Sequence, residues 1–373
     1  MQKVTPLPPP RQPSREEVVS LGADRTVVFG EMVGRGACAT VYRGILEGPY
    51  RVRRPVAIKV FDALATEERD QVIAGLARAT RHAACVHHPN VASPQELFLV
   101  TPNEPIIVSE WVDGVTLQRF VDTHRKINRR VATDLALFIA LEAAEGLTGA
   151  RDAFTPERVR LNMGHHGLSG REILLSVHGE VKVCDFGLAL ALRQSSGVLH
   201  LRSIAKRVST LPPEVAQGSR GDARSDVFSL GMILREMLVG PRFSDETTDA
   251  KILDMARDGS IQGSPLERQL PEPIASILRR AIEIEPSRRY PHAGIFADDL
   301  RRACTPMGVG DGRVYLRQAL EEMFRDRQQA DDEPTTDYGE LRAAPTTDQT
   351  SWGLDSGSRM VRAEKVEHDE EDD

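Results

Sequence analysis

One lysine on an apolar run, preceded by a glycine-rich turn, is the part of this sequence best suited to binding phosphate. Gly34 and Gly36 stand in Val-Gly-Arg-Gly-Ala-Cys-Ala-Thr-Val, where the missing Cβ atoms let backbone N–H groups approach phosphate oxygens. Lys59 ends Val-Ala-Ile-Lys, and an ammonium group on an apolar strand is costly without an anionic partner. The turn alone would be an ordinary hairpin feature, but the turn and the lysine together predict a phosphate-binding site.

The elements that must position these groups follow from the hydrophobic pattern. β-rich runs at 26–34, 40–46 and 55–61 predict three strands that carry the glycine-rich turn and Lys59, and further strands are expected at 104–111 and 180–186. Apolar residues at three- and four-residue spacing predict helices at 65–84, 131–150, 225–239, 273–284, 292–304 and 311–328. This order predicts an α+β class, with a small β-rich lobe over 26–110 and a larger helical lobe over 114–305.

The two ends of the sequence differ from this body. Residues 1–25 are rich in proline and are expected to form a flexible leader. The net charge is −7, and residues 326–373 carry 15 Asp and Glu against 5 Lys and Arg, so a disordered acidic tail is expected over 329–373. The helix expected at 311–328 is predicted to dock on its own lobe rather than on a partner, through one apolar face made of Leu316, Leu320, Met323 and Phe324.

Several classes of function are disfavoured by composition. The body lacks the clustered basic stripe of a nucleic-acid-binding protein. No apolar run reaches the roughly 18 residues that a spanning helix needs, and the N-terminal stretch lacks the apolar segment of a signal peptide. The four cysteines are scattered, without the spacing of a zinc site or a disulfide framework. A cytoplasmic protein with no nucleic-acid partner and no membrane segment is expected.

The order of the motifs resembles the eukaryotic-type Ser/Thr protein kinases, and Ala39 and Ser169 match the variants found in their bacterial, myxobacterial-like branch. The resemblance covers about 26–305 and implies a bilobal kinase-like fold that uses ATP with Mg²⁺ or Mn²⁺. Ser109 falls at the gatekeeper position before the hinge. The positions that match the family's nucleotide-binding residues are Gly34, Gly36, Val41, Ala57, Lys59, Glu110, Val112, Leu174 and Asp185. Those that match its structural residues are His165, Phe186, Glu214, Asp226 and Arg289.

Matched position by position to the family's motifs, the catalytic loop of this chain is altered. Gly167 stands where the family has its catalytic Asp, a proton acceptor whose role is worth about 10²- to 10⁴-fold in rate. Glu172 replaces the metal-binding Asn, and residues 206–210 replace a small Gly-Thr segment that cradles substrate. Glu172 is expected to be a metal ligand beside Asp185, because a carboxylate can hold magnesium. A locally paired surface acid is the alternative for Glu172, and packing of Phe186 is the alternative reason for keeping the Asp-Phe-Gly motif.

A further departure concerns the partner of Lys59. The family pairs this lysine with a Glu on the following helix, and counting back from the His-Pro-Asn turn places Ala79 at that position. Residues 71–90 contain no acid, so Lys59 is expected to pair with Asp185 or with a bound phosphate. These departures favour a pseudokinase that acts as a nucleotide-responsive scaffold or regulator in bacterial Ser/Thr phosphosignalling. A weakly active kinase, with His165 or His166 as a substitute base, is the alternative.

The acidic tail repeats a possible phosphoacceptor motif. Pro-Thr-Thr-Asp occurs twice, with its threonines at Thr335, Thr336, Thr346 and Thr347. The expected partners are other signalling proteins: an active Ser/Thr kinase would phosphorylate these threonines, and a forkhead-associated domain would then bind them. Compositional repetition in a solubilising tail is the alternative.

Phosphorylation of the tail is testable in cells. We expect mass spectrometry to find phosphothreonine in one or both repeats when the partner kinases are present, since threonines in an unfolded stretch are accessible. Complete sequence coverage of the tail with no phosphothreonine would contradict this hypothesis.

Overall fold

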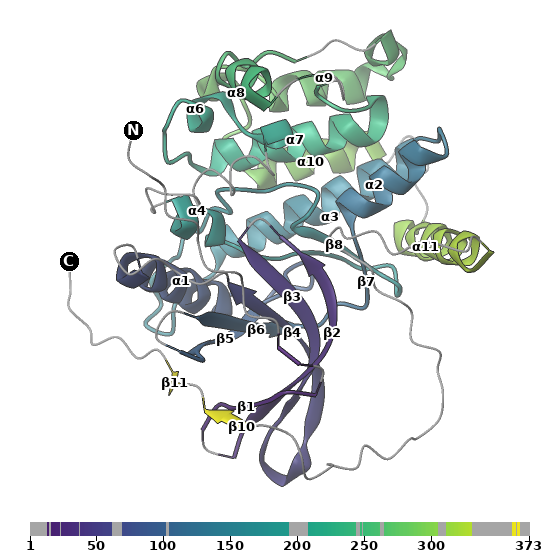
Figure 1. The fold of residues 1–373 in the computed structure, drawn as a ribbon. Coiled ribbons are helices and arrows are strands. Elements are labelled where there is room, and N and C mark those ends of the chain that lie inside the picture. Colours follow the sequence, from purple (N-terminus) through teal and green to yellow (C-terminus); the bar gives the residue numbers. More distant parts are fainter. Residues whose placement is uncertain are drawn as a thin grey trace.

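The computed structural model describes residues 13–14, 16–22, 24–36, 38–61, 69–101, 104–193, 208–243, 247, 249–261, 265–304, 311–329, 360–362 and 364–365. A β-rich lobe lies below a helical lobe in Figure 1, and the chain passes from one to the other after β6. The predicted α+β class and the two-lobe architecture are therefore confirmed.

The small lobe is one curled sheet with the strand order β10-β1-β2-β3-β4-β6-β5-β11. All neighbouring strands are antiparallel except β1 and β10, which are parallel. Helix α1 (Arg69–Ala84) packs beside β5. The strands are β1 (Val18–Ser20), β2 (Thr26–Arg35), β3 (Ala39–Glu47), β4 (Arg53–Phe61), β5 (Pro94–Leu99), β6 (Pro105–Glu110), β10 (Met360–Arg362) and β11 (Glu364–Lys365).

The period-two pattern of β4 places Lys59. Val56, Ile58 and Val60 are buried in the small-lobe core, so Ala57 and Lys59 point to the opposite face of the sheet. The β3–β4 pairing sets Val41 directly across from Lys59. A slip of one residue would turn the ammonium group into the apolar core, and the cost of burying it there fixes the register.

The large lobe is built around α3 (Thr133–Asp152) and α7 (Ala223–Val239). Both helices are largely buried in one hydrophobic core, as expected for helices that are apolar on most of their circumference. A capping box of Asp222 and Ser225 begins α7. The other α-helices among the described residues are α2 (Leu117–Lys126), α4 (Leu188–Arg193), α6 (Pro213–Ala216), α8 (Asp249–Arg257), α9 (Glu272–Ala281), α10 (Ala293–Cys304) and α11 (Gly312–Gln329).

A second, three-stranded sheet lies where the lobes meet. Its order is β7 (Gly114–Thr116), β8 (Ile173–Ser176) and β9 (Val181–Val183). Gly114 is required at this position, because a Cβ there would lie 1.8 Å from the carbonyl oxygen of Leu175. The sheet therefore brings the start of the large lobe against the strands that precede Asp185.

The strands and helices predicted between residues 26 and 304 are confirmed, with ends that shift by a few residues. The helix expected at 65–84, for example, is α1 at Arg69–Ala84. Strands β5 and β7 and helices α2, α4, α6 and α8 were not predicted. They are short, and β5 includes Gln95 and Glu96, so its strand conformation depends on pairing with β6 rather than on an apolar run.

Two expectations about the chain ends are corrected. The leader expected over 1–25 includes β1, whose Val19 is fully buried in the small-lobe core. The acidic tail expected to be disordered includes β10 and β11, which pair with β1 and β5. The other residues of 330–373 lie outside the described residues.

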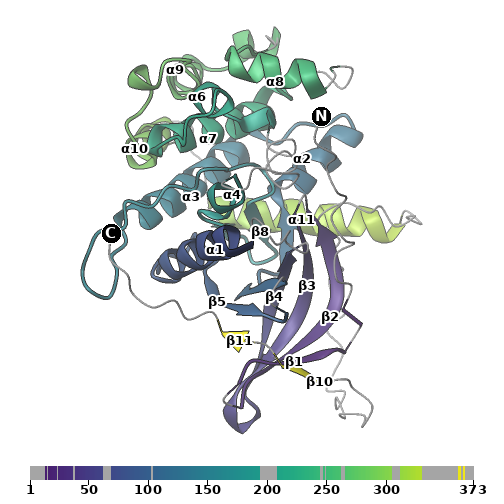
Figure 2. The same ribbon diagram turned by 60° about the vertical axis from the view of Figure 1, so that its left-hand side comes forward.

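Docking of α11 on its own lobe is confirmed: Leu316, Leu320 and Met323 are buried in the large-lobe core, and Phe324 packs against it (Figure 2).

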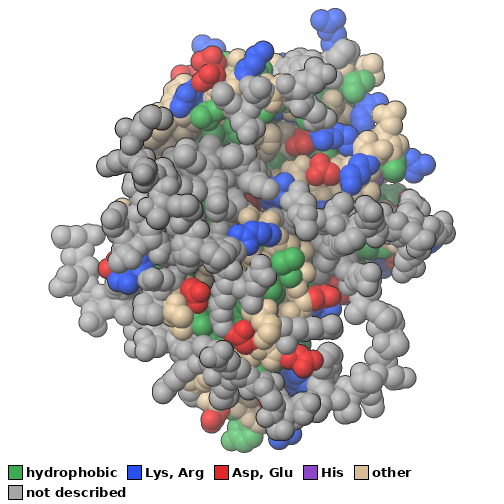
Figure 3. Space-filling view, in the orientation of Figure 1, with side chains coloured by type: hydrophobic (Ala, Val, Ile, Leu, Met, Phe, Trp, Pro, Cys, Tyr) green, Lys and Arg blue, Asp and Glu red, His purple; other side chains and the backbone are tan. Residues whose placement is uncertain are grey.

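The described surface carries charges of both signs. Lys and Arg side chains lie among Asp and Glu side chains over the face shown in Figure 3, and neither sign gathers into one patch there. Among the described helices, none has the length and apolar character needed to cross a bilayer.

Candidate nucleotide site between the lobes

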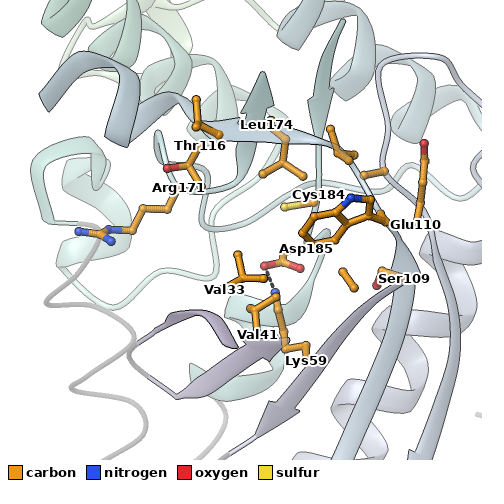
Figure 4. A pocket seen from close by; sticks show the side chains of 16 residues that line it. Val33, Val41, Lys59, Ser109, Glu110, Thr116, Arg171, Leu174, Cys184 and Asp185 are labelled. Atoms are coloured by element: carbon orange, nitrogen blue, oxygen red, sulfur yellow. Dashed lines mark hydrogen bonds and ion pairs between the residues drawn. The ribbon is translucent and has the colours of Figure 1, made fainter. Parts of the chain in front are cut away.

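A pocket between the lobes, named the cleft pocket, collects most of the predicted nucleotide-binding residues. Strands β2, β3 and β4 contribute one wall, and β8 with the segment after β9 contributes the other (Figure 4). The predicted residues in its lining are Val41, Ala57, Lys59, Ser109, Glu110, Val112, Leu174 and Asp185. Apolar side chains above and below a flat space, with polar groups at one end, suit an aromatic ring attached to a charged group.

The lining also includes Trp111 and Gly114 of the expected hinge segment, together with residues that sequence reasoning missed: Val33, Ala92, Val115, Thr116, Arg171 and Cys184. Trp111 directly follows the predicted Glu110, and the Arg43 guanidinium lies 5.3 Å from the centre of its ring, a cation–π distance. This contact had no signal in the sequence, because Arg43 of β3 and Trp111, which follows β6, come together only in the folded lobe. The Glu110 carboxylate forms an ion pair with Lys182 of β9, with 2.8 Å between Oε1 and Nζ.

Lys59 and Asp185 form an ion pair that joins the two lobes (Figure 4). Both side chains are mostly buried, with 16% and 23% of their surface exposed. Asp185 has a φ of 66°, an uncommon conformation for a non-glycine residue and one often found at functional sites. The prediction that Lys59 would turn to Asp185 is confirmed for this structure. The Asp185 carboxylate is therefore the anionic partner of Lys59 in the cleft pocket.

Position 79 lies against the Asp-Phe-Gly segment, as the alignment implied. A Cβ on Gly187 would lie 3.2 Å from the Cβ of Ala79, so α1 approaches this segment closely at a buried alanine. Asp70, an acid near the start of α1, is exposed and bonds to its neighbour Arg69 at 2.7 Å. Position 79 thus faces the site without a charge.

The loop between α3 and β8 is held by a buried carboxylate. Asp226 of α7 accepts hydrogen bonds from the backbone N–H groups of His165, at 2.7 Å, and His166, at 2.9 Å. The His165 ring is fully buried, bonds to the Cys184 carbonyl at 2.9 Å and packs at a tilt against Phe186 with ring centres 4.9 Å apart. These contacts give His165, Phe186 and Asp226 structural roles. Neither His165 nor His166 is among the described residues that line the cleft pocket.

Two residues of this loop bear on catalysis. Gly167 follows the anchored His166 and brings no side chain that could accept a proton. Glu172 is buried, and its carboxylate accepts hydrogen bonds from both the backbone N–H and the hydroxyl of Ser169. It is not in the described lining of the cleft pocket, and no group of three metal-binding side chains occurs among the described residues. Metal binding by Glu172 stays a prediction, and it would have to compete with the bonds from Ser169.

The glycine-rich turn joins β2 to β3 above the cleft pocket. Gly34 pairs with Val41, and the Gly36 N–H donates to the Ala39 carbonyl at 2.7 Å. Contact of this turn with phosphate stays a prediction. Lys206, Arg207 and the four tail threonines lie outside the described residues.

Glu214 and Arg289 form the predicted ion pair of the large lobe. Two guanidinium nitrogens donate to the two carboxylate oxygens at 2.8 and 2.9 Å, and the Arg289 side chain is fully buried. Burial alone would raise the pKa of Glu214, but the hydrogen bonds from Arg289 and Ser225 outweigh it and hold this pKa below its ordinary value. The pair ties α6 to the turn before α10.

A kinase fold with this cleft agrees with comparisons to known proteins. The family model described as protein tyrosine and serine/threonine kinase matches residues 27–298. The chain belongs to this family of protein kinases.

Its relatives include bacterial kinases. The chain is 31% identical over 285 residues to the serine/threonine-protein kinase PknB of Mycolicibacterium smegmatis, covering 74% of this chain and 42% of that protein. It is 30% identical over 311 residues to the tyrosine-protein kinase MasK of Myxococcus xanthus, covering 80% and 47%. The chain thus spans less than half the length of these two relatives. A crystal structure of the Mycobacterium tuberculosis PknI kinase domain matches with a TM-score of 0.56 at 19% identity, covering 78% of this chain and 99% of that one.

The Glu214–Arg289 pair predicts a pH-dependent stability difference. Glu214→Gln should lower the free energy of unfolding by about 2 kcal/mol at pH 7, less than for a fully buried pair because Glu214 is partly exposed. A lowered carboxyl pKa stabilises the fold fully above its unfolded value of 4.5, and this contribution is lost as the pH falls through the folded value. Urea unfolding between pH 7 and pH 4 should show the difference shrinking below pH 4.5.

The matched control is Glu272→Gln, because Glu272 pairs with Arg279 at an exposed site. Its effect should be under about 0.5 kcal/mol at every pH. A Glu214→Gln effect as small as the control, or one that grows with acidification, would contradict the assignment.

Proposed function

We propose that this chain is a nucleotide-binding pseudokinase, which uses the kinase cleft to sense ATP rather than to transfer its phosphoryl group. The observation that carries the proposal is Gly167, because a kinase loop anchored through Asp226 presents a glycine where the substrate hydroxyl would need a carboxylate. The apolar walls of the cleft pocket would hold the adenine ring, and Lys59 would meet the phosphates.

The residues that would hold a divalent metal are fewer than the family uses. Magnesium usually takes one or two protein carboxylates together with phosphate oxygens, and Asp185 supplies one carboxylate in the cleft pocket. A bound metal would neutralise phosphate charge beside Lys59. Binding would require the Lys59–Asp185 ion pair to rearrange, because the same carboxylate serves both cations. This exchange gives the cleft a nucleotide-dependent contact between the lobes, as a nucleotide-responsive regulator needs.

A weakly active kinase remains the second candidate. Lys59 and Asp185 are both in the cleft, and positioning and electrostatic stabilisation alone leave some catalysis when a base is missing. The bacterial relatives PknB and MasK are named as kinases, which supports this second candidate.

Thermal unfolding tests nucleotide binding. ATP with magnesium should raise the melting temperature, by an amount that corresponds to about 2.7 kcal/mol when ATP is 100-fold above its Kd. Asp185→Asn should remove the part of this rise that depends on magnesium, since an amide is a weaker metal ligand than a carboxylate. Asp113→Asn, next to the lining residue Val112 but outside the described lining, is the matched control and should keep it. An unchanged melting temperature at millimolar ATP would contradict the proposal that the cleft pocket binds nucleotide.

Phosphate incorporation separates the two candidates. Incubated with γ-labelled ATP, magnesium or manganese, and a general protein substrate, the chain should incorporate no label above a Lys59→Met variant. Lys126→Met, at the exposed end of α2, controls for loss of a lysine as such. Label that Lys59→Met abolishes and Lys126→Met preserves would establish a kinase and overturn the pseudokinase proposal.

A further inference from the structure

The two outer edges of the main small-lobe sheet face each other. Strands β1 and β5 stand at opposite ends of the order β1-β2-β3-β4-β6-β5, yet the curl of the sheet brings them together. Arg25, in the turn after β1, forms an ion pair with Glu96 of β5. Val19 of β1 and Phe98 of β5 are buried in the same hydrophobic core. These contacts come from the folded lobe itself and do not involve the C-terminal residues.

One extended chain fills the space between the edges. Val18, Val19 and Ser20 pair in parallel with Met360, Val361 and Arg362, and two residues later Glu364 and Lys365 pair antiparallel with Leu99 and Phe98. Only residue 363 separates β10 from β11 in the sequence, and both strands lie between β1 and β5 in the two ribbon views (Figures 1 and 2). With β10 and β11 paired, neither β1 nor β5 is a bare edge along the paired residues.

We propose that the β1 and β5 edges form a binding site for one extended peptide strand, and that residues 360–365 of the same chain are its resident ligand. Backbone N–H and C=O groups on both sides would supply the affinity, as in other cases of strand addition. Because each edge contributes only two or three paired residues, neither edge alone would hold a strand firmly.

The sequence of the tail favours this segment over its neighbours. Residues 359–366 read Arg-Met-Val-Arg-Ala-Glu-Lys-Val and hold three of the five Lys and Arg residues of 326–373. The acidic run after them ends in Asp-Glu-Glu-Asp-Asp, which repels itself and contains residue types that are depleted in strands. The paired segment is therefore the part of the tail with the best strand character.

The covalent link raises the effective concentration of a strand that pairs only weakly with the two edges. Helix α11 is docked on the large lobe and residues 360–365 on the small lobe, so the chain from 330 to 359 connects the two. A tether of this length reaches up to about 100 Å when extended, which leaves the strand free to detach and rebind at an effective millimolar concentration. The site is thus exchangeable.

Hydrogen–deuterium exchange tests the site. In a chain that ends at Ser358, exchange should rise about tenfold in peptides covering both β1 and β5, while peptides from β3 and β4 keep their protection. Val361→Pro in the full chain should reproduce this, because proline removes a backbone donor in the middle of β10. Gln349→Pro, a proline placed elsewhere in the tail, is the matched control and should change neither edge.

Addition of a peptide of residues 355–373 at millimolar concentration to the shortened chain should restore protection at both edges. The proposal is overturned if truncation leaves β1 and β5 unchanged, if only one edge responds, or if the peptide fails to restore protection. Size-exclusion chromatography of the full chain should give a monomer whose edge protection does not change on dilution. A dimer that loses protection on dilution would instead show that a second copy supplies the strand, and would overturn assignment to the same chain.

Discussion

The cleft depends on how a charged lysine is accommodated on an apolar strand. The pairing of β4 turns Lys59 away from the small-lobe core, and without an anion its burial would cost several kcal/mol. Ala79 offers no charge, so the ammonium group pairs with Asp185 of the other lobe. One ion pair therefore fixes the lysine, presents the Asp-Phe-Gly carboxylate and connects the two lobes.

The charged groups that hold the large lobe lie at the family's positions, whereas Gly167 and Ala79 stand where the family has acids. Asp226 anchors the loop before Gly167, and the fully buried Arg289 engages both oxygens of Glu214. Removing either carboxylate would leave buried donors without a partner, which is expensive for any protein with this fold. Gly167 and Ala79 have no such structural cost, because a small residue fits both positions. This division supports the proposal that the chain is a pseudokinase.

The C-terminal residues extend the same logic to the surface. Helix α11 buries Leu316 and Leu320 in the large lobe, while β10 and β11 pair with the edges of the small lobe. Apolar burial gives the helix a stable position, whereas a few backbone hydrogen bonds give the strands an exchangeable one. The C-terminal region is thus held firmly at α11 and exchangeably at β10 and β11.

The sequence by itself determined the features that are encoded locally. Periodicity predicted β2, β3, β4 and the long helices. Motif spacing identified Lys59 and Asp185 as cleft residues and Asp226 and Glu214 as structural residues. Tertiary structure alone decided which anion Lys59 would take, that Ser169 would occupy the Glu172 carboxylate, and that Arg43 would cover Trp111. It also decided the strands at 360–365, since their partners at 18–20 and 98–99 are hundreds of residues away and short segments acquire strand structure only by pairing.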